Sequence, residues 1–314
     1  MLYSRQVFSF LAFITGLVVA IQSRVAGELT RNVHNGITAA TFSNYVGWII
    51  LCFLVFGFKR ERAAFFEVIN ALRTGRIKFW EILGGFGGAL FISTQSTQVP
   101  IIGVALFTIT YIAGQTVFAL IVDEIGLTSN GKKKITISRV ISALITLVGV
   151  AVAVYPDLTS SHFALFPIIL VIVIGAATSL QQAINSRINV ITGRPLVTAW
   201  FNFTAGSFLI TSVMGIRVLM GNPFGSLPTA PHQLWLYSGG ILGLIFIATT
   251  AYILKHLGIL KWGLIGVIGQ LVGALILDWL VPAHKEAISG YLLTGAAITL
   301  ISVLGARYFE AKSK

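Results

Sequence analysis

Two glutamines inside long apolar stretches are the side chains of this sequence best suited to bind a small polar molecule. Gln115 and Gln270 each follow a glycine. A carboxamide has two hydrogen-bond donors and a carbonyl acceptor, which must be kept away from lipid hydrocarbon. Two interpretations follow. The glutamines join helices through hydrogen bonds typically worth under about 1 kcal/mol each, or they line a cavity beside the glycine.

Other amide and aromatic side chains recur in apolar stretches of both halves of the chain. No single one is a specific signal, but their recurrence predicts a polar cavity that the two halves share. The expected substrate-binding residues are Gln115, Gln270, Gln22, Gln181, Asn185, Asn44, Trp48, Trp200 and Asn202, with Gln182 and Tyr45 beside them.

Two acidic residues lie near the C-terminal ends of apolar stretches. The helix dipole disfavours a carboxylate at the position of Asp123 or Asp278. Either acid could pair with an interfacial cation such as Arg139, or it could be a proton or cation site near a gate. Glu28, expected at the outer end of the first stretch, is a further candidate for gating or ion coupling.

The sequence lacks the residue patterns of enzyme chemistry. Its five histidines lie at or near loops and are too dispersed for a metal cluster or a catalytic base. Its one cysteine, Cys52, cannot form a paired thiolate site, and there is no GxxxxGK[ST] phosphate loop. We therefore expect no enzyme activity, no metal and no cofactor.

The composition is that of a membrane protein. Of the 314 residues, 56% are hydrophobic and 10% are charged, whereas about a quarter are charged in soluble domains. The net charge is +12. Most basic residues lie in short segments between apolar stretches, so the charge predicts orientation in a membrane and not binding to nucleic acid.

Ten stretches are apolar and long enough to cross a lipid bilayer. They cover residues 7–27, 36–57, 80–98, 101–122, 138–155, 163–185, 195–219, 232–254, 258–280 and 288–308. The sequence therefore predicts an all-α integral membrane protein with ten transmembrane helices.

The third and fourth stretches repeat as the eighth and ninth when the numbering is shifted by 155. From Gly84 to Asp123 this shift gives fourteen identities without a gap, five of them glycines. Gly114-Gln115 falls on Gly269-Gln270, and Asp123 falls on Asp278. Such fixed spacing of polar residues indicates an internal repeat.

A weaker match relates the first two stretches to the sixth and seventh. A shift of 159 gives five identities in 32 positions, one of which pairs Gln22 with Gln181. We predict two five-helix repeats, residues 1–155 and 163–314, joined by a linker at residues 156–162.

Glycines dominate the repeated segment. In lipid, small residues let helix backbones approach closely, so helix packing is the first interpretation of these glycines. The second is that they leave room for a substrate or for sliding between helices. The residues are Gly84, Gly85, Gly88, Gly239, Gly240 and Gly243.

Basic residues predict that the repeats are inverted. With the N-terminus in the cytoplasm, 18 of the 22 Lys and Arg residues lie on the cytoplasmic side and 4 lie outside. Five spans per repeat is an odd number, so the second repeat enters the membrane upside down. Both termini are then cytoplasmic. Residues 60–73 place Phe65, Ile69 and Leu72 on one face, which predicts a short helix on the cytoplasmic membrane surface.

The repeated motifs resemble a known family. The combination of Gly84-Gly85 with Gly88-Ala89, Pro100 with Gly103, Gly114-Gln115, and Asp123 with Gly126-Leu127 is similar to the bacterial YdcZ-type family of the drug/metabolite transporter superfamily. The second copy departs from the pattern, with Lys255 where the first has Pro100. The resemblance implies a ten-helix inner-membrane protein with the DMT/EamA-like fold, formed by fusion of two five-helix units.

The resemblance implies transport without naming a substrate. Small multidrug transporters of this superfamily carry a glutamate in the first helix, whereas the nearest polar residue here is Gln22, which cannot exchange a proton. We expect a secondary transporter that exports a small organic metabolite or drug-like compound by alternating access. The alternative is a membrane scaffold or sensor. The expected partners are the bilayer and a small-molecule substrate, and the sequence is compatible with a homodimer.

The inverted repeat makes a topological prediction. A reporter fused after Lys314 should report the cytoplasm, and one inserted between Thr159 and Ser160 should report the outside, because an odd number of spans separates them. Enzymatic reporters active on one side of the membrane measure this directly. If both fusions report the same side, five spans per repeat is wrong.

Overall fold

The computed structural model describes residues 2–127, 131–132, 134–158, 165–282 and 288–312. The described residues contain helices and no β-strand. The α-helices are α1 (Leu2–Val33), α2 (Gly36–Gly57), α3 (Lys59–Arg73), α4 (Gly85–Ile125), α5 (Ile137–Leu158), α6 (Leu165–Thr192), α7 (Pro195–Leu219), α8 (Gly239–Leu280) and α9 (Gly290–Lys312). Two 3₁₀ helices, η1 (Phe79–Gly84) and η2 (Pro231–Ser238), precede α4 and α8.

Two of these helices are too long for one crossing of the membrane. The apolar segment Phe79–Ile125 has 47 residues, and α8 has 42. At 1.5 Å per residue both exceed about 60 Å, roughly twice the hydrocarbon core of a bilayer. Counting each of them twice, with α1, α2, α5, α6, α7 and α9 once each, gives ten spans. The predicted all-α, ten-span architecture is confirmed.

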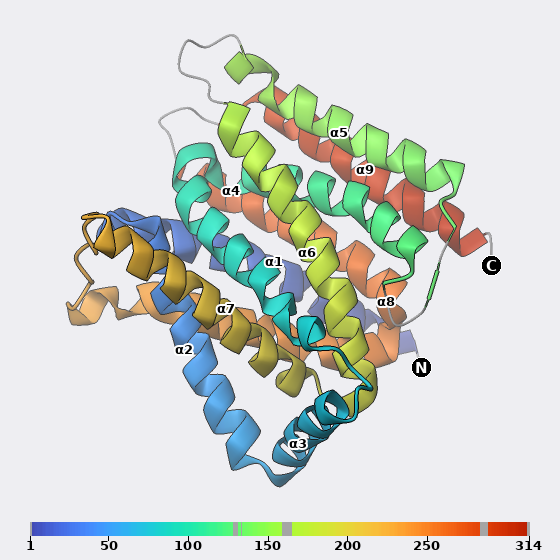
Figure 1. Cartoon of the computed structure of the whole chain (residues 1–314). Coiled ribbons are helices and arrows are strands. Elements are labelled where there is room, and N and C mark those ends of the chain that lie inside the picture. The colour runs from blue at the N-terminus through green and yellow to red at the C-terminus, as the bar shows by residue number, and fades with distance from the viewer. Residues whose placement is uncertain (1, 128–130, 133, 159–164, 283–287, 313–314) are drawn as a thin grey trace.

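A break at Gly103 divides α4 into a first arm, residues 85–102, and a second arm, residues 104–125. Gly103 has φ 81° and ψ 168°, a backbone conformation that glycine adopts far more readily than other residues. The boundary predicted between the stretches 80–98 and 101–122 is therefore wrong by a few residues, because helix continues through Pro100. Figure 1 shows the second arm of α4 folding back from the first.

The two halves of the chain interlock. The closest helix pairs are α1 with α8, α4 with α6, α5 with α9 and α2 with α7, and each pair joins one helix from each half. The shift that relates the halves turns the α1–α8 pair into the α6–α4 pair, as expected for inverted repeats. Figure 1 shows α5 and α9 side by side along one edge of the molecule, with both chain ends on the same side. Of the predicted linker at 156–162, residues 156–158 belong to α5, and the rest lies outside the described residues.

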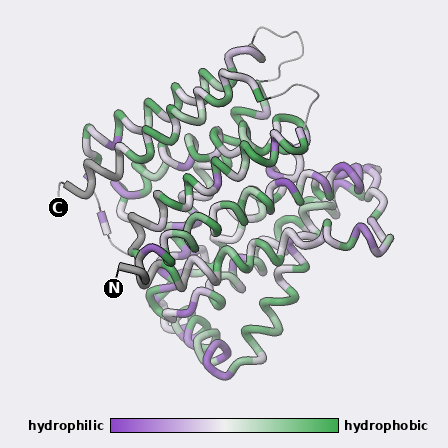
Figure 2. The backbone as a smooth tube through the Cα atoms, turned by 180° about the vertical axis from the view of Figure 1, so that it is seen from behind, coloured by the Kyte–Doolittle hydropathy of each residue, from purple (hydrophilic) through white to green (hydrophobic). Residues whose placement is uncertain are grey.

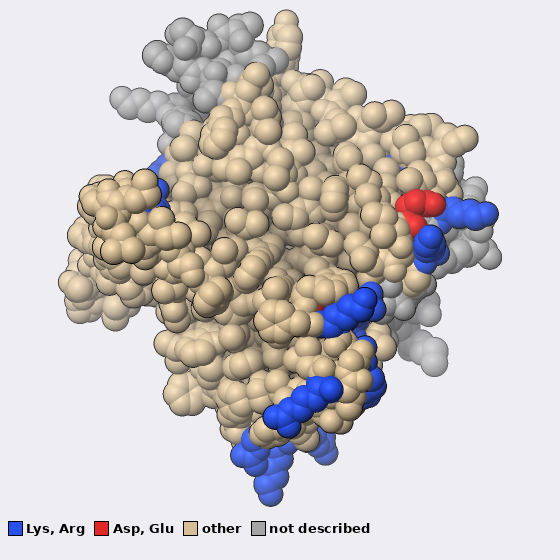
Figure 3. Space-filling model, in the orientation of Figure 1, with Lys and Arg blue, Asp and Glu red and all other residues tan. Residues whose placement is uncertain are grey.

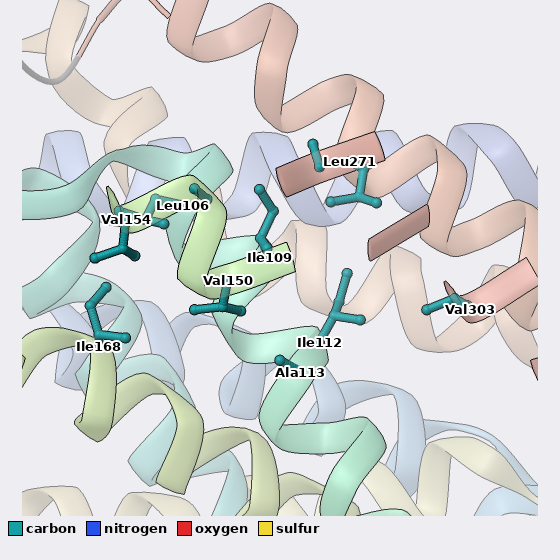
Figure 4. Packing of buried hydrophobic residues seen from close by; sticks show 11 residues of the cluster. Leu106, Ile109, Ile112, Ala113, Val150, Val154, Ile168, Leu271 and Val303 are labelled. Carbon is teal, nitrogen blue, oxygen red and sulfur yellow. The ribbon is translucent and has the colours of Figure 1, made fainter. Parts of the chain in front are cut away.

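One apolar cluster ties the second arm of α4 to both halves. Leu106, Ile109 and Ile112 pack against Val150 of α5 and Leu271 of α8, and helices α6 and α9 complete the cluster (Figure 4). This cluster fixes the part of α4 that carries Gln115.

The predicted surface helix exists as α3, but its apolar side faces protein. Phe65 stacks on Phe201 of α7 with ring centroids 5.6 Å apart. Ile69 and Leu72 pack against the same cluster, which includes Val55 of α2 and Ile188 of α6. The helix thus covers the ends of three membrane helices, and the prediction that it lies on lipid is corrected.

Polar and charged residues gather at the ends of the molecule. Figure 2 shows hydrophobic residues along the helices and hydrophilic segments around α3 and at the opposite end. Figure 3 shows Lys and Arg gathered over α3 and near the chain termini. We refer to this side, defined by α3 (Lys59–Arg73), as the α3 end.

Candidate functional site

Glycine pairs bring helix backbones into contact at two equivalent crossings. Where α4 crosses α6, a Cβ on Gly114 would collide with the carbonyl oxygen of Ile172, and a Cβ on Gly175 with that of Tyr111. Where α8 crosses α1, the equivalent glycines, Gly269 and Gly16, are blocked by backbone in the same way. Gln115 and Gln270 directly follow the crossing glycines.

Gln115 lies near polar groups at its crossing. Gln115 Nε2 donates to the Tyr111 hydroxyl at 3.3 Å, and Ser179 Oγ donates to the backbone carbonyl oxygen of Gln115 at 2.8 Å. Gln270 is half-buried. No hydrogen bond links the two carboxamides among the described residues, so the polar cavity that the two halves are expected to share stays a prediction.

The repeated glycines at the starts of α4 and α8 touch helices of the other half. A Cβ on Gly85 would collide with the carbonyl oxygen of Asn202 in α7, and one on Gly240 with that of Ser43 in α2. The remaining glycines of this set, Gly84, Gly88, Gly239 and Gly243, face polar side chains of α6, α7, α1 and α2. Some of these glycines therefore allow close contact between helix backbones, and others lie beside polar side chains.

Three predicted amides converge at the start of α4. Gln181 Nε2 lies 3.5 Å from Asn202 Oδ1, at the limit of a hydrogen bond. A Cβ on Gly88 would lie 2.9 Å from Gln181 Nε2, and one on Gly84 would lie 2.9 Å from Asn185 Oδ1. Gln182, the neighbour of Gln181, is exposed.

The equivalent position in the other half is less polar. Gln22 faces Gly243, with its Nε2 atom 3.2 Å from where a Cβ would lie, and Ser43 Oγ faces Gly239 at 3.2 Å. Nearby, Gln95 of α4 donates from Nε2 to Ser23 Oγ at 2.7 Å and is fully buried. The sequence interpretation missed Gln95, although the unbroken polar run at residues 93–98 marks that end of the third apolar stretch.

The remaining predicted binding residues lie along the seam between α2 and α7. Asn44 donates to Ser207 Oγ at 2.8 Å, and Trp48 Nε1 donates to Thr204 Oγ1 at 2.9 Å. Trp200 Nε1 donates to the Cys52 sulfur at 3.3 Å. These hydrogen bonds join α2 to α7, and the role of the side chains in substrate binding stays a prediction.

The acidic candidates have three different environments. Asp123 accepts from Arg139 Nη2 at 2.5 Å, which is the pairing named in the first interpretation. Glu28 lies between Arg24, at 2.5 Å, and Arg31, at 3.0 Å. Asp278 has a different role, described next.

Asp278 caps the broken helix of the other half. Its carboxylate accepts hydrogen bonds from the backbone N–H groups of Val104, at 3.0 Å, and Ala105, at 2.6 Å. These are the first donors of the second arm of α4, which have no partner within the arm because the helix breaks at Gly103. The positive end of the helix dipole stabilises the buried charge. The unfavourable place of Asp278 in its own helix is thus offset by a favourable one at the start of another.

Ion pairs close the α3 end of the molecule. Glu81 of η1 is buried, accepts the backbone N–H of Lys78 at 3.0 Å, and lies 2.8 Å from Arg187 Nε of α6. Arg194 donates to Glu61 of α3 at 3.1 Å. The amide cluster of Gln181, Asn185 and Asn202 lies next to this layer of charges, since Asn185 is two residues from Arg187.

These features define a multi-pass membrane protein built from two interlocked, inverted repeats with polar groups at the crossings. A family model described as "Putative inner membrane exporter, YdcZ" matches residues 7–152 and 166–305, once in each half. The chain belongs to this family of inner-membrane exporters, within the drug/metabolite transporter superfamily.

The fold of the chain is also similar to that of a solved structure. A solved structure described only as "Crystal structure of protein" has a TM-score of 0.53 and 17% identity, and the match covers 99% of each chain. At that identity the likeness shows the fold alone. No curated protein matches the sequence.

The Asp278 cap makes a prediction about stability. Replacing Asp278 by Ala leaves the N–H groups of Val104 and Ala105 unpaired and should cost on the order of 2 kcal/mol. The melting temperature should fall, and hydrogen exchange at these two amides should accelerate. Glu67→Ala, which removes an exposed carboxylate of α3, is the control and should change neither. Unchanged exchange in Asp278→Ala would show that the cap does not hold the helix.

Proposed function

We propose that this protein is a secondary transporter that exports a small organic molecule by alternating access. The family is one of inner-membrane exporters, and the substrate and mechanism are the proposal. The observation that carries it is the position of Gln115 and Gln270 beside two equivalent backbone crossings, each made by helices from both halves. Polar groups at such crossings change their surroundings when the halves tilt against each other.

The proposed orientation places both termini and the α3 end in the cytoplasm. It is supported by the division of Lys and Arg, 18 to 4, and by the position of both chain ends on one side (Figure 1). In this orientation the amide cluster of Gln181, Asn185 and Asn202 lies toward the cytoplasm, and the Asp278 cap lies toward the outside.

The two interlocked halves supply a route for coupling the two sides. The Asp278 carboxylate of α8 accepts hydrogen bonds from the start of the second arm of α4. The same arm crosses α6 at Gly114 and Gly175. Movement at the outer cap would therefore be passed by a rigid helix to the crossing beside Gln115. Closely packed crossings favour discrete arrangements over gradual deformation.

Paired measurement of stability and transport tests the role of the glutamines. We expect Gln115→Leu and Gln270→Leu to leave expression and melting temperature nearly unchanged and to weaken transport or ligand binding at least tenfold. A thermal-shift screen of metabolites and drug-like compounds supplies the ligand, because specific binding stabilises the native state. Gln182→Leu, at an exposed position of α6, is the matched control and should keep full activity.

The alternative role of the glutamines predicts the reverse. If they only join helices, each change should lower stability, by about 0.6 kcal/mol on average for an intramembrane hydrogen bond, and activity per folded molecule should stay normal. Normal ligand affinity in the double variant would remove both glutamines from the binding site. Absence of any transported compound would favour a scaffold or sensor.

A further inference from the structure

Comparison of the two repeats shows which side chains close helix packing requires. Gly84 and Gly239 are equivalent, and the side chains that face them are equivalent too. Ile184 and Asn202 approach Gly84, while Val25 and Ser43 approach Gly239. The shift of 159 found in the sequence therefore holds in space at this site.

At this site the two halves carry different side chains on the same backbone arrangement. Asn185, Thr198 and Asn202 in the second half correspond to Ala26, Ala39 and Ser43 in the first. The first half packs its helices with the smaller, less polar set. Close packing of α4 on α6 and α7 therefore does not require two amides and a hydroxyl, which are costly to bury in a membrane protein.

Within the protein, the extra polar groups of the second half have few hydrogen-bond partners. Asn185 Oδ1 and Thr198 Oγ1 are buried and have no hydrogen-bond partner among the described residues, and the Thr198 residue is only 6% exposed. Asn202 Oδ1 has only the long contact of 3.5 Å from Gln181. A buried polar atom without a partner is unfavourable unless something else supplies one.

Two of these groups meet at Gly84, the last residue of η1, and Thr198 lies one turn before Asn202 on α7. Gln181 and Asn185 are one turn apart on α6, and Thr198 and Asn202 are one turn apart on α7, so each pair lies on one helix face. Asn185 and Asn202 both approach Gly84, which has no side chain. Next to them lies the Glu81–Arg187 ion pair, at the end that is cytoplasmic in the proposed orientation.

We infer that Asn185, Thr198 and Asn202 form the cytoplasmic loading subsite for the exported substrate. The inference rests on the proposed function and adds the chemistry of the ligand. Asn185 Oδ1 and the Thr198 hydroxyl have no partner in the part of the protein that the structure describes, and Asn202 Oδ1 has only a 3.5 Å contact. These acceptors match a compound that presents N–H or O–H groups, such as an amine or a polyhydroxyl compound. Ser43, whose Oγ also has no hydrogen-bond partner among the described residues, is the smaller counterpart toward the outside, where release requires weaker binding.

The first test needs no ligand. Thr198→Val removes the hydroxyl with little change of shape, and Asn185→Leu does the same for the amide. Both variants should keep or raise the melting temperature, because the groups lost have no partner in the protein. Thr146→Val is the matched control, since the Thr146 hydroxyl bonds Ser302 at 2.9 Å and the Ser142 carbonyl at 2.8 Å, and its melting temperature should fall. If Thr198→Val and Asn185→Leu fall as far as the control, these groups are structural and the inference is overturned.

The second test uses ligand pairs that differ only in their donors. The probes are a primary alkylammonium and its trimethylated counterpart, and a diol and its dimethyl ether. In wild-type protein only the donor-bearing member of a pair should raise the melting temperature. In the Asn185→Leu/Thr198→Val double variant, the ligand concentration that gives half of this shift should be at least tenfold higher. Equal stabilisation by a methylated member, or an unchanged shift in the double variant, would overturn the inference.

Transport in proteoliposomes separates the subsite from the proposed function. If wild-type protein transports a stabilising compound and the double variant transports it equally well, the subsite is wrong and the exporter proposal stands. If the stabilising compound binds through the subsite but no labelled compound crosses the membrane, the subsite stands and the exporter proposal fails.

Discussion

Contact between helix backbones without intervening side chains is the constraint on which this structure depends. In lipid, apolar surface gives helices little reason to associate, so close packing and inter-helix hydrogen bonds must hold them together. Gly114 with Gly175, and Gly16 with Gly269, provide this contact at two equivalent crossings between the halves. Any larger residue at these four positions would push one repeat away from the other. The repeats thus form one interlocked body and not two separate bundles.

The crossings also explain where polar chemistry can be placed. In the pair Gly114-Gln115, the glycine allows two backbones to approach closely, and the carboxamide of the next residue lies beside that contact. The broken helix at Gly103 adds free backbone donors, and Asp278 from the other half accepts from them. Irregular backbone inside a membrane is tolerated where it is satisfied in this way. The same devices that hold the halves together therefore supply the groups a transport path requires.

The sequence was sufficient to predict the spans, the repeat and the inverted arrangement, because apolar length and glycine spacing are properties of the chain itself. It could not predict that Asp278 caps Val104, since this depends on a break in another helix and on how the halves meet. It missed Gln95 and Thr198, which lie in runs without a repeated partner. It could not predict that Trp48 and Trp200 have hydrogen-bond partners across the α2–α7 seam, and their role in substrate binding stays a prediction. Side-chain type predicted which residues are buried but did not predict their hydrogen-bond partners.

Alternating access is the central claim, and the distances on the two sides of the membrane test it most directly. Spin labels at exposed positions, one in each half, would report on each side in a Cys52→Ser background: Tyr155 with Leu219 on the outer side, and Asn70 with Leu304 on the α3 side. Pulsed electron–electron double resonance should measure these distances without ligand and with the compound that most stabilises the protein. The account predicts opposite changes, one distance lengthening as the other shortens. Distances that stay fixed on both sides, or lengthen together, would contradict it.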